Sequence, residues 1–211
     1  MVMSIPYELS GRSHQKMRTR RALIAAAREL LAEGVAPTVE RTADRAAISR
    51  TTAFRYFPNQ RALLVATYPQ LGMQSLLEPG APEDPVSRLE AVVQEFTQHV
   101  LAFEPELRAQ LRLALEPGPK QPDELPLRQG RVIAWIEEAL SPLSKLIPER
   151  DLHRLVLAIR ATTGIEALVW LTDVAGISRR EAIDIMRSSA RTLLGAAIAE
   201  AAPAPARQSR Q

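Results

Sequence analysis

The chain of 211 residues is long enough for one or two domains, and it contains no cysteine. Disulfide frameworks, thiolate nucleophiles and cysteine-based zinc sites are therefore excluded, and the composition fits a reducing compartment such as the cytoplasm. With 46% hydrophobic and 24% charged residues, the chain is expected to be soluble, with a substantial core. We expect no secretory signal, because residues 1–8 have neither a basic nor an apolar region of the kind that a signal requires. We expect no membrane span, because the longest mostly apolar stretch, residues 193–206, is interrupted by Glu200 and two prolines.

The net charge of +3 is unevenly distributed along the chain. Residues 1–64 carry a net charge of +6, whereas the remainder carries −3. Arginine outnumbers lysine by 24 to 3, and its planar guanidinium group suits phosphates and guanine edges. This distribution favours an N-terminal segment that binds a polyanion, although an arginine-rich protein with ordinary solvated faces would show the same charges.

Apolar residues recur at helical spacing along the sequence, and we find no convincing strand pattern and no internal repeat, so the predicted fold class is all-α. The sequence predicts helices over residues 13–33, 39–46, 50–57, 59–72, 86–103, 105–115, 127–140, 149–174 and 179–201. Thr38, Ser49, Asn59 and Ser178 are the expected N-caps. Residues 78–85 are expected to form a linker and residues 116–126 a loop, and residues 1–12 and 203–211 are expected to be disordered tails.

Residues 39–46 and 50–57 form two short predicted helices about one tight turn apart. This spacing is typical of a helix-turn-helix, whose second helix enters the major groove of DNA. The residues placed for the shared core are Ala43, Ala46, Ile48, Ala53 and Phe57. The outward residues suited to base edges are Arg50, Thr51, Thr52 and Arg55, and those suited to phosphates are Tyr56 and Thr38. Two amphipathic helices within an ordinary all-α core would show the same small residues.

A longer series of residues, from about Arg20 to Leu64, resembles the N-terminal domain of the TetR family of bacterial transcription regulators. The residues that carry the resemblance are Ala25-Ala26-Ala27, Leu30-Leu31, Gly34, Thr38-Val39, Ala43, Ala46, Ile48-Ser49-Arg50, Thr52, Phe54-Arg55-Tyr56-Phe57-Pro58 and Leu63-Leu64. The chain departs from the family where glycine is usual, at Ala47 and Thr51, and Gln60 replaces a lysine that often binds a phosphate. An alanine with positive φ at position 47 would be strained.

The resemblance implies a DNA-binding domain at residues 13–58, joined through a fourth helix to a ligand-binding and dimerisation domain at residues 59–202. It implies a cytoplasmic homodimer that binds a double-stranded, palindromic operator and represses transcription until a small-molecule effector of unknown identity releases it. Phe54, Gln60 and Arg61 complete the expected DNA-binding set. The wide apolar faces of the last two predicted helices also favour dimerisation, whereas burial of these faces within one chain is the alternative.

The resemblance also implies an effector pocket among the C-terminal helices. Aromatic and histidine side chains placed to line it are Phe96, His99, Phe103, Trp135 and Trp170, although residues at helical spacing are more often plain core. Regulation without an effector and activation of transcription remain alternatives. An enzyme is a distant third, because nucleotide-binding loops, a serine nucleophile elbow and a zinc-protease motif are absent, and His14, His99 and His153 lack metal-ligand spacing. No cofactor is expected.

Overall fold

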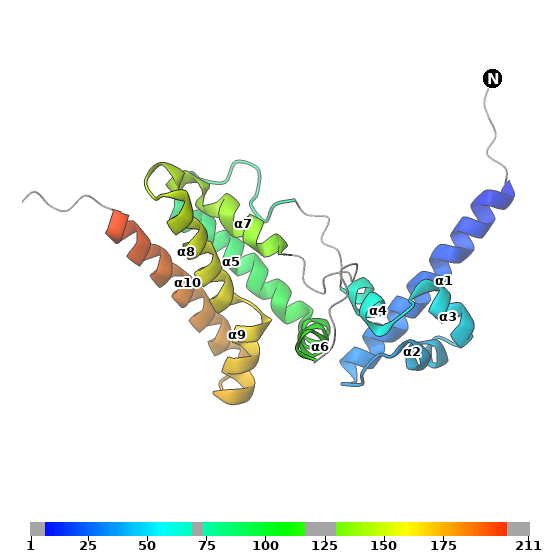
Figure 1. The fold of residues 1–211 in the computed structure, drawn as a ribbon. Coiled ribbons are helices and arrows are strands. Elements are labelled where there is room, and N and C mark those ends of the chain that lie inside the picture. Colours follow the sequence, from blue (N-terminus) through cyan, green and yellow to red (C-terminus); the bar gives the residue numbers. More distant parts are fainter. Residues whose placement is uncertain (1–6, 69–73, 117–129, 202–211) are drawn as a thin grey trace, which may run out of the picture. The chain divides into compact units, whose positions relative to one another are not determined.

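The computed structural model describes residues 7–68, 74–116 and 130–201, and every regular element within these ranges is helical, which confirms the all-α fold class (Figure 1). The α-helices are α1 (Tyr7–Ala32), α2 (Val39–Arg45), α3 (Arg50–Tyr56), α4 (Gln60–Thr67), α5 (Pro85–Ala102), α6 (Glu104–Leu115), α7 (Arg131–Leu140), α8 (Glu149–Thr163), α9 (Ile165–Val169) and α10 (Arg179–Ala201). A 3-10 turn, Ser141–Lys145, follows α7, and a π-helical turn, Trp170–Val174, follows α9.

The chain divides into two compact units. The first comprises residues 1–71 and 103–129, and the second comprises residues 72–102 and 130–211. The expected division assigned residues 59–202 to one domain, whereas α4 and α6 pack with α1 in the first unit. Sequence periodicity shows that a helix has an apolar face but not which other helix covers that face.

Helix α1 starts at Tyr7, earlier than the predicted start at Ser13. Residues 13–18 are all exposed, and the buried face begins at Leu23. Apolar periodicity reveals a helix only where one face is buried, so it does not detect this extension. The expected disordered arm therefore differs from the structure over residues 7–12. Residues 1–6 and the predicted tail at 203–211 lie outside the described residues, as does most of the predicted loop at 116–126.

The core of the first unit joins α1 to the three helices that follow it. Its buried members are Leu23, Ala27, Val39, Ala43, Ala53, Phe57 and Leu63, and Ala46 and Ile48 pack against them. All five residues predicted for the core between α2 and α3 thus lie in or against this cluster. Burial of small alanines where the two helices meet allows their backbones to approach closely, as a helix-turn-helix requires.

The second unit is a bundle in which α5, α7, α8 and α10 pack against one another (Figure 1). Its largest buried side chains include Leu89, Ile136, Leu140, Ile159, Met186 and Leu194. Ser178 caps α10, since its Oγ accepts a hydrogen bond from the backbone N–H of Glu181 at 3.2 Å, as the sequence predicted.

The helix predicted over residues 149–174 is interrupted at Gly164, which separates α8 from α9 with an extended backbone (φ −96°, ψ −176°). The apolar pattern continues on both sides of this break, so periodicity alone does not reveal it. By length and composition, Glu149–Val174 is the one segment among the described residues that could cross a membrane. A core helix meets the same criterion, and α8 packs against α7 and α10.

Candidate DNA-binding surface

Helices α2 and α3 are joined by a tight turn, and each begins at the residue that the sequence predicted. The hydroxyl oxygen of Thr38 accepts a hydrogen bond from the N–H of Arg41 at 3.2 Å, and that of Ser49 accepts one from the N–H of Thr52 at 3.3 Å. These caps satisfy N–H groups that have no partner within the helix. The starting points of both helices are therefore determined locally, which fixes the length of the turn between them.

Ala47 lies in this turn with a φ of +53° and is the one non-glycine residue with positive φ in the described part of the chain. The left-handed conformation brings an L-residue's Cβ close to its own backbone, which costs about 1–2 kcal/mol. The conformation is nevertheless required, because the N–H of Ile48 reaches back to the carbonyl of Ala43 at 3.0 Å and closes the turn. The strain expected from the sequence is confirmed.

Replacing this residue, Ala47→Gly, should raise the free energy of unfolding by about 0.5–1 kcal/mol. The strain relieved in the folded state exceeds the extra entropy that glycine gains in the unfolded chain. Urea denaturation followed by circular dichroism measures the change. Ala25→Gly is the control, because Ala25 is exposed within α1 and the same change there should cost about 1 kcal/mol. If Ala47→Gly lowers the free energy of unfolding as much as Ala25→Gly does, Ala47 is not strained.

Helix α3 has a buried face and an outward face. Ala53 is completely buried, whereas Arg50, Thr51, Phe54 and Arg55 are exposed. Tyr56 and Thr52 are half-buried, and the hydroxyl of Thr52 accepts a hydrogen bond from the hydroxyl of Ser49 at 2.8 Å. The predicted set therefore forms one exposed surface on a short helix, with its two half-buried members at the border of the core.

The remaining predicted DNA contacts lie at the starts of α2 and α4. Thr38 caps α2 and is half-buried. Gln60 and Arg61 form the first turn of α4 and are also half-buried, directly after Asn59, whose side chain caps that helix through the N–H of Ala62 at 2.8 Å. Helix starts are suited to phosphate binding, because the free N–H groups and the helix dipole favour an anion.

Arg50, the first residue of α3, is held by a carboxylate of α2. Its guanidinium forms an ion pair with Asp44 at 2.9 Å, with a second hydrogen bond at 3.3 Å. The hydrogen bond from Arg50 lowers the pKa of Asp44. Both side chains are about 60% exposed, so water weakens the pair, and a phosphate or a guanine edge brought to Arg50 would compete with Asp44 for the same donors.

The change Asp44→Asn should increase affinity for duplexes of any sequence. It removes a carboxylate that competes for Arg50 and repels phosphates, so the slope of log affinity against log salt should become more negative by about 0.9. Fluorescence anisotropy with a random-sequence duplex over a range of KCl concentrations measures this slope. Glu149→Gln, an exposed charge on α8, is the control and should leave the slope unchanged. The same slope in Asp44→Asn and wild type would show that Asp44 does not restrain Arg50.

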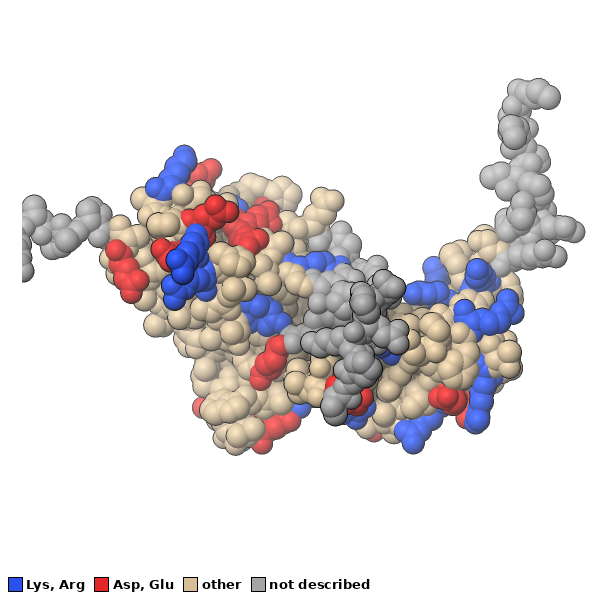
Figure 2. Space-filling model, viewed as in Figure 1, with Lys and Arg blue, Asp and Glu red and all other residues tan. Residues whose placement is uncertain are grey.

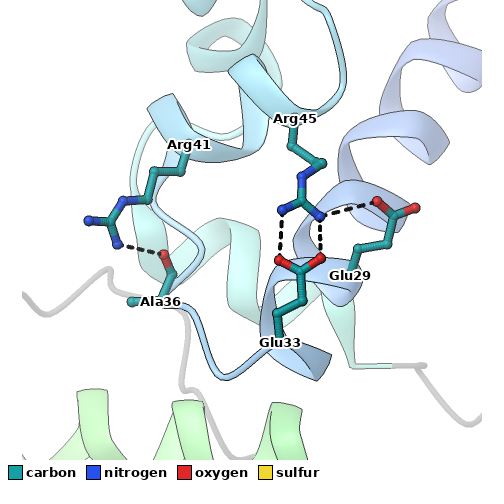
Figure 3. A network of polar contacts seen from close by, with 5 residues as sticks. All are labelled: Glu29, Glu33, Ala36, Arg41 and Arg45. Carbon is teal, nitrogen blue, oxygen red and sulfur yellow. Dashed lines mark hydrogen bonds and ion pairs between the residues drawn. The ribbon is translucent and has the colours of Figure 1, made fainter.

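Arg45 has a structural role and joins α2 to the end of α1 (Figure 3). It donates two hydrogen bonds to the carboxylate of Glu33, both 2.7 Å long, and lies 3.6 Å from Glu29. The hydrogen bond from Arg45 lowers the pKa of Glu33. Arg41, in the same view, donates to the carbonyl of Ala36 at 3.5 Å. Part of the positive charge of the N-terminal segment is therefore used to hold α2 against α1.

The comparison with known families matches the part of the chain that contains this surface. The pattern described as "Bacterial regulatory proteins, tetR family" matches residues 23–67, from the first buried residue of α1 to the end of α4. This match identifies residues 23–67 as an N-terminal domain of the TetR family type. No curated protein sequence matches this chain.

A domain of this type indicates a DNA-binding transcriptional regulator with an N-terminal helix-turn-helix. The match runs from residue 23 to residue 67, so it covers α1 from Leu23 onward together with α2, α3 and α4, and it does not extend into the second unit. The TetR domain here differs from the usual pattern at Ala47, which is strained, and at Thr51, which adds an exposed side chain to the outward face of α3.

The five residues predicted to line an effector pocket occupy different places. Phe96 and Trp135 are buried in the second unit, and His99 is half-buried there; burial lowers the pKa of His99. Trp170 is 57% exposed, at the start of the π-helical turn. Phe103 belongs to the first unit, where its ring meets that of Tyr68 edge-on at 5.9 Å between centroids.

Two of these pocket candidates have defined contacts within the second unit. The indole N–H of Trp135 donates to the carbonyl of Gln74 at 3.2 Å, and the guanidinium of Arg160 lies 5.6 Å from the ring centroid of Phe96. A separate shallow groove runs between α5 and α10 and contains none of the five. It is lined by Val86, Leu89, Glu90, Val93, Arg187, Ala190, Arg191 and Leu194.

Proposed function

We propose that this regulator is a homodimeric repressor that binds a palindromic operator in the cytoplasm and is released by a small-molecule effector. The observation that carries the proposal is the outward face of α3, where Arg50, Thr51 and Arg55 are exposed on a capped helix above a buried core. The major groove is wide enough to admit an α-helix, and the arginines of α3 can bind guanine in bidentate fashion.

Dimerisation is supported by the exposed face of α10. A single seven-residue helix contacts few base pairs, whereas a two-fold dimer presents two such helices about 34–36 Å apart. On α10, a largely uncharged exposed face could accept a second copy of the chain, together with Leu157 of α8, which is 44% exposed. The exposed residues of this α10 face are Ile185, Ser188, Thr192, Gly195, Ala196 and Ala199.

Gly195 provides a test of the dimer. A Cβ atom added there would have no atom within 4 Å in the protomer, so a larger side chain fits the single chain. Gly195→Gln should therefore shift the sedimentation coefficient from dimer to monomer at micromolar concentration and weaken operator binding. Gly195→Ala is the matched control and should retain the dimer. A wild-type chain that sediments as a monomer would overturn the proposed assembly.

Release by an effector is supported by the position of α6. Helix α5 belongs to the second unit, and α6, which directly follows it, packs against α1 and α4 in the first. The side-chain amide of the buried Gln110 donates to the carbonyl of Leu64 in α4 at 3.1 Å. A ligand that displaces α5 near Phe96 and His99 would pull on α6 and, through α6, on the DNA-binding helices.

Selection from a random duplex library, followed by a promoter–reporter assay, tests the proposal. Selected duplexes should contain an inverted repeat, and the protein should lower reporter expression from a promoter that carries it. Metabolites that bind the purified protein should weaken operator binding, and operator should weaken metabolite binding by the same factor. Increased expression would indicate an activator, and binding that no bound metabolite alters would indicate a regulator without an effector.

A further inference from the structure

We infer that Phe54, on the outward face of α3, contacts the C5-methyl group of a thymine in the major groove and so helps to select the operator sequence; this rests on the proposed function. Phe54 is 40% exposed, whereas Phe57 and Phe96 are buried and Phe103 is half-buried. It is therefore the one phenylalanine of four that keeps much of its ring in water. Covering such a ring is favourable, because apolar surface then leaves water.

Packing within the first unit does not explain this exposed ring. Phe54 is neither in the core cluster of that unit nor among the residues packed against it. Within the part of the chain that the structure describes, no second aromatic ring and no cation lies against the ring of Phe54. Single exposed apolar side chains are common on protein surfaces, so what distinguishes Phe54 is its position on α3.

Phe54 lies in the middle of the outward face of α3. Residues three or four apart share one face of a helix, so Phe54 lies beside Thr51, and both are exposed. Arg50 and Arg55 border this pair, and the buried Ala53 is on the opposite side of the helix. Figure 2 shows Lys and Arg side chains on the surface of the first unit, with few acidic ones among them. An apolar ring bordered by guanidinium groups fits a polyanion that also presents an apolar group.

The chemistry of the phenyl ring selects the group that it contacts in DNA. Phenylalanine has no side-chain hydrogen-bond donor or acceptor, so it cannot bind a phosphate or a polar base edge as arginine does. The apolar group that base pairs present in the major groove is the C5-methyl group of thymine. Contact between this methyl group and the ring removes apolar surface of both from water. Thr51 also carries a methyl group, so an experiment has to separate its contribution from that of Phe54.

Duplex DNA fits the surroundings of the ring better than a membrane does. A helix that lies in a membrane interface needs an apolar face. Phe54 is the one large apolar side chain that is exposed on α3, and arginines border it. The net charge of +6 over residues 1–64 also favours a polyanion.

The test removes this methyl group from the DNA. Anisotropy is measured with the best duplex from the selection, in which each thymine in turn is replaced by uracil in both half-sites. Uracil keeps the O4 acceptor of thymine and lacks only the C5-methyl group. At one position, wild-type affinity should fall about fourfold per methyl group, or about 15-fold for the two half-sites together. In Phe54→Ala, the ratio of thymine to uracil affinity at that position should be about one.

Further variants separate Phe54 from its neighbour. Because the ratio is taken within each variant, a general loss of affinity cancels. Phe54→Gln introduces a polar side chain that favours a helix, as alanine does, and should also give a ratio of about one. Phe54→Leu keeps an apolar side chain and should keep part of the wild-type ratio. Thr51→Ser removes the neighbouring methyl group and should keep the full ratio at this position, whatever its overall affinity.

Cytosine with and without a C5-methyl group provides a second readout. 5-Methylcytosine carries its methyl group at the same ring position as thymine. With cytosine in place of the identified thymine, paired with guanine, wild-type affinity should be about fourfold higher per site when that cytosine is methylated. Phe54→Ala should bind the methylated and unmethylated duplexes alike. The contact would thus make binding sensitive to cytosine methylation at this position.

The outcomes that overturn the inference differ from the one that overturns the proposed function. If uracil at every position leaves wild-type affinity unchanged, the inference is wrong although the protein still binds an operator. A wild-type ratio in both Phe54→Ala and Phe54→Gln also overturns it, and a ratio lost in Thr51→Ser assigns the methyl contact to Thr51 instead. A wild-type protein that prefers no selected duplex overturns the proposed function and the inference with it.

Discussion

Replacing Arg55 with alanine should weaken binding to the selected operator by about 1–3 kcal/mol and remove discrimination at one base-pair position. Arg55 is exposed in the last turn of α3, and its guanidinium can donate two hydrogen bonds to the O6 and N7 of a guanine. A buried partner such as Ala53 keeps the helix in place when the side chain is shortened, so the loss reports the contact with DNA.

The measurement is anisotropy with a panel of duplexes, each carrying one base-pair change from the selected sequence. In Arg55→Ala, one position should become tolerant of all four base pairs while the others retain their penalties. Arg150→Ala, an exposed arginine on α8, is the control and should leave the whole profile unchanged. A uniform loss across all duplexes would mean that Arg55 contacts a phosphate and does not read a base.

Replacing Leu64 with alanine should lower the free energy of unfolding by about 2–5 kcal/mol. Leu64 is fully buried in α4, in a cluster with Leu31 of α1 and Ala109 of α6. Shortening it removes apolar contacts with both helices and leaves a cavity that the rigid helices cannot fill completely. The loss should therefore exceed that of an exposed leucine on the same unit.

Urea denaturation followed by circular dichroism measures this difference. Leu115→Ala is the control, because Leu115 is 74% exposed at the end of α6, and its replacement should change the free energy by less than about 0.5 kcal/mol. Similar small losses in both variants would show that α6 does not form part of the core of the first unit. That result would also remove the support that α6 lends to effector-controlled release.

Several features of the DNA-binding domain follow from residues close together in the sequence. Thr38, Ser49 and Asn59 cap the helices where predicted, because a cap depends on one side chain and an N–H two or three residues later. The positive φ at Ala47 follows from the length of the turn. The alternation of buried and exposed positions in α3 follows from helical periodicity.

Contacts between distant residues were not predictable in the same way. The break at Gly164 lies inside a continuous apolar pattern, and the partners of Arg45 and Arg50 come from preceding helices. The pocket prediction grouped Phe103 with Trp170 by residue type, whereas the structure places them in different units. Which charge pairs with which depends on the packing of helices and not on local sequence.

The sequence by itself therefore determined the all-α class, the capped starts of α2, α3, α4 and α10, and the outward residues of α3, because caps and periodicity act over a few neighbouring residues. Tertiary structure alone decided that α6 packs with α1 and α4, that Asp44 restrains Arg50, and that the start of α1 stays exposed beside α3. These features depend on which apolar faces cover one another, and many pairings of similar faces satisfy the same pattern.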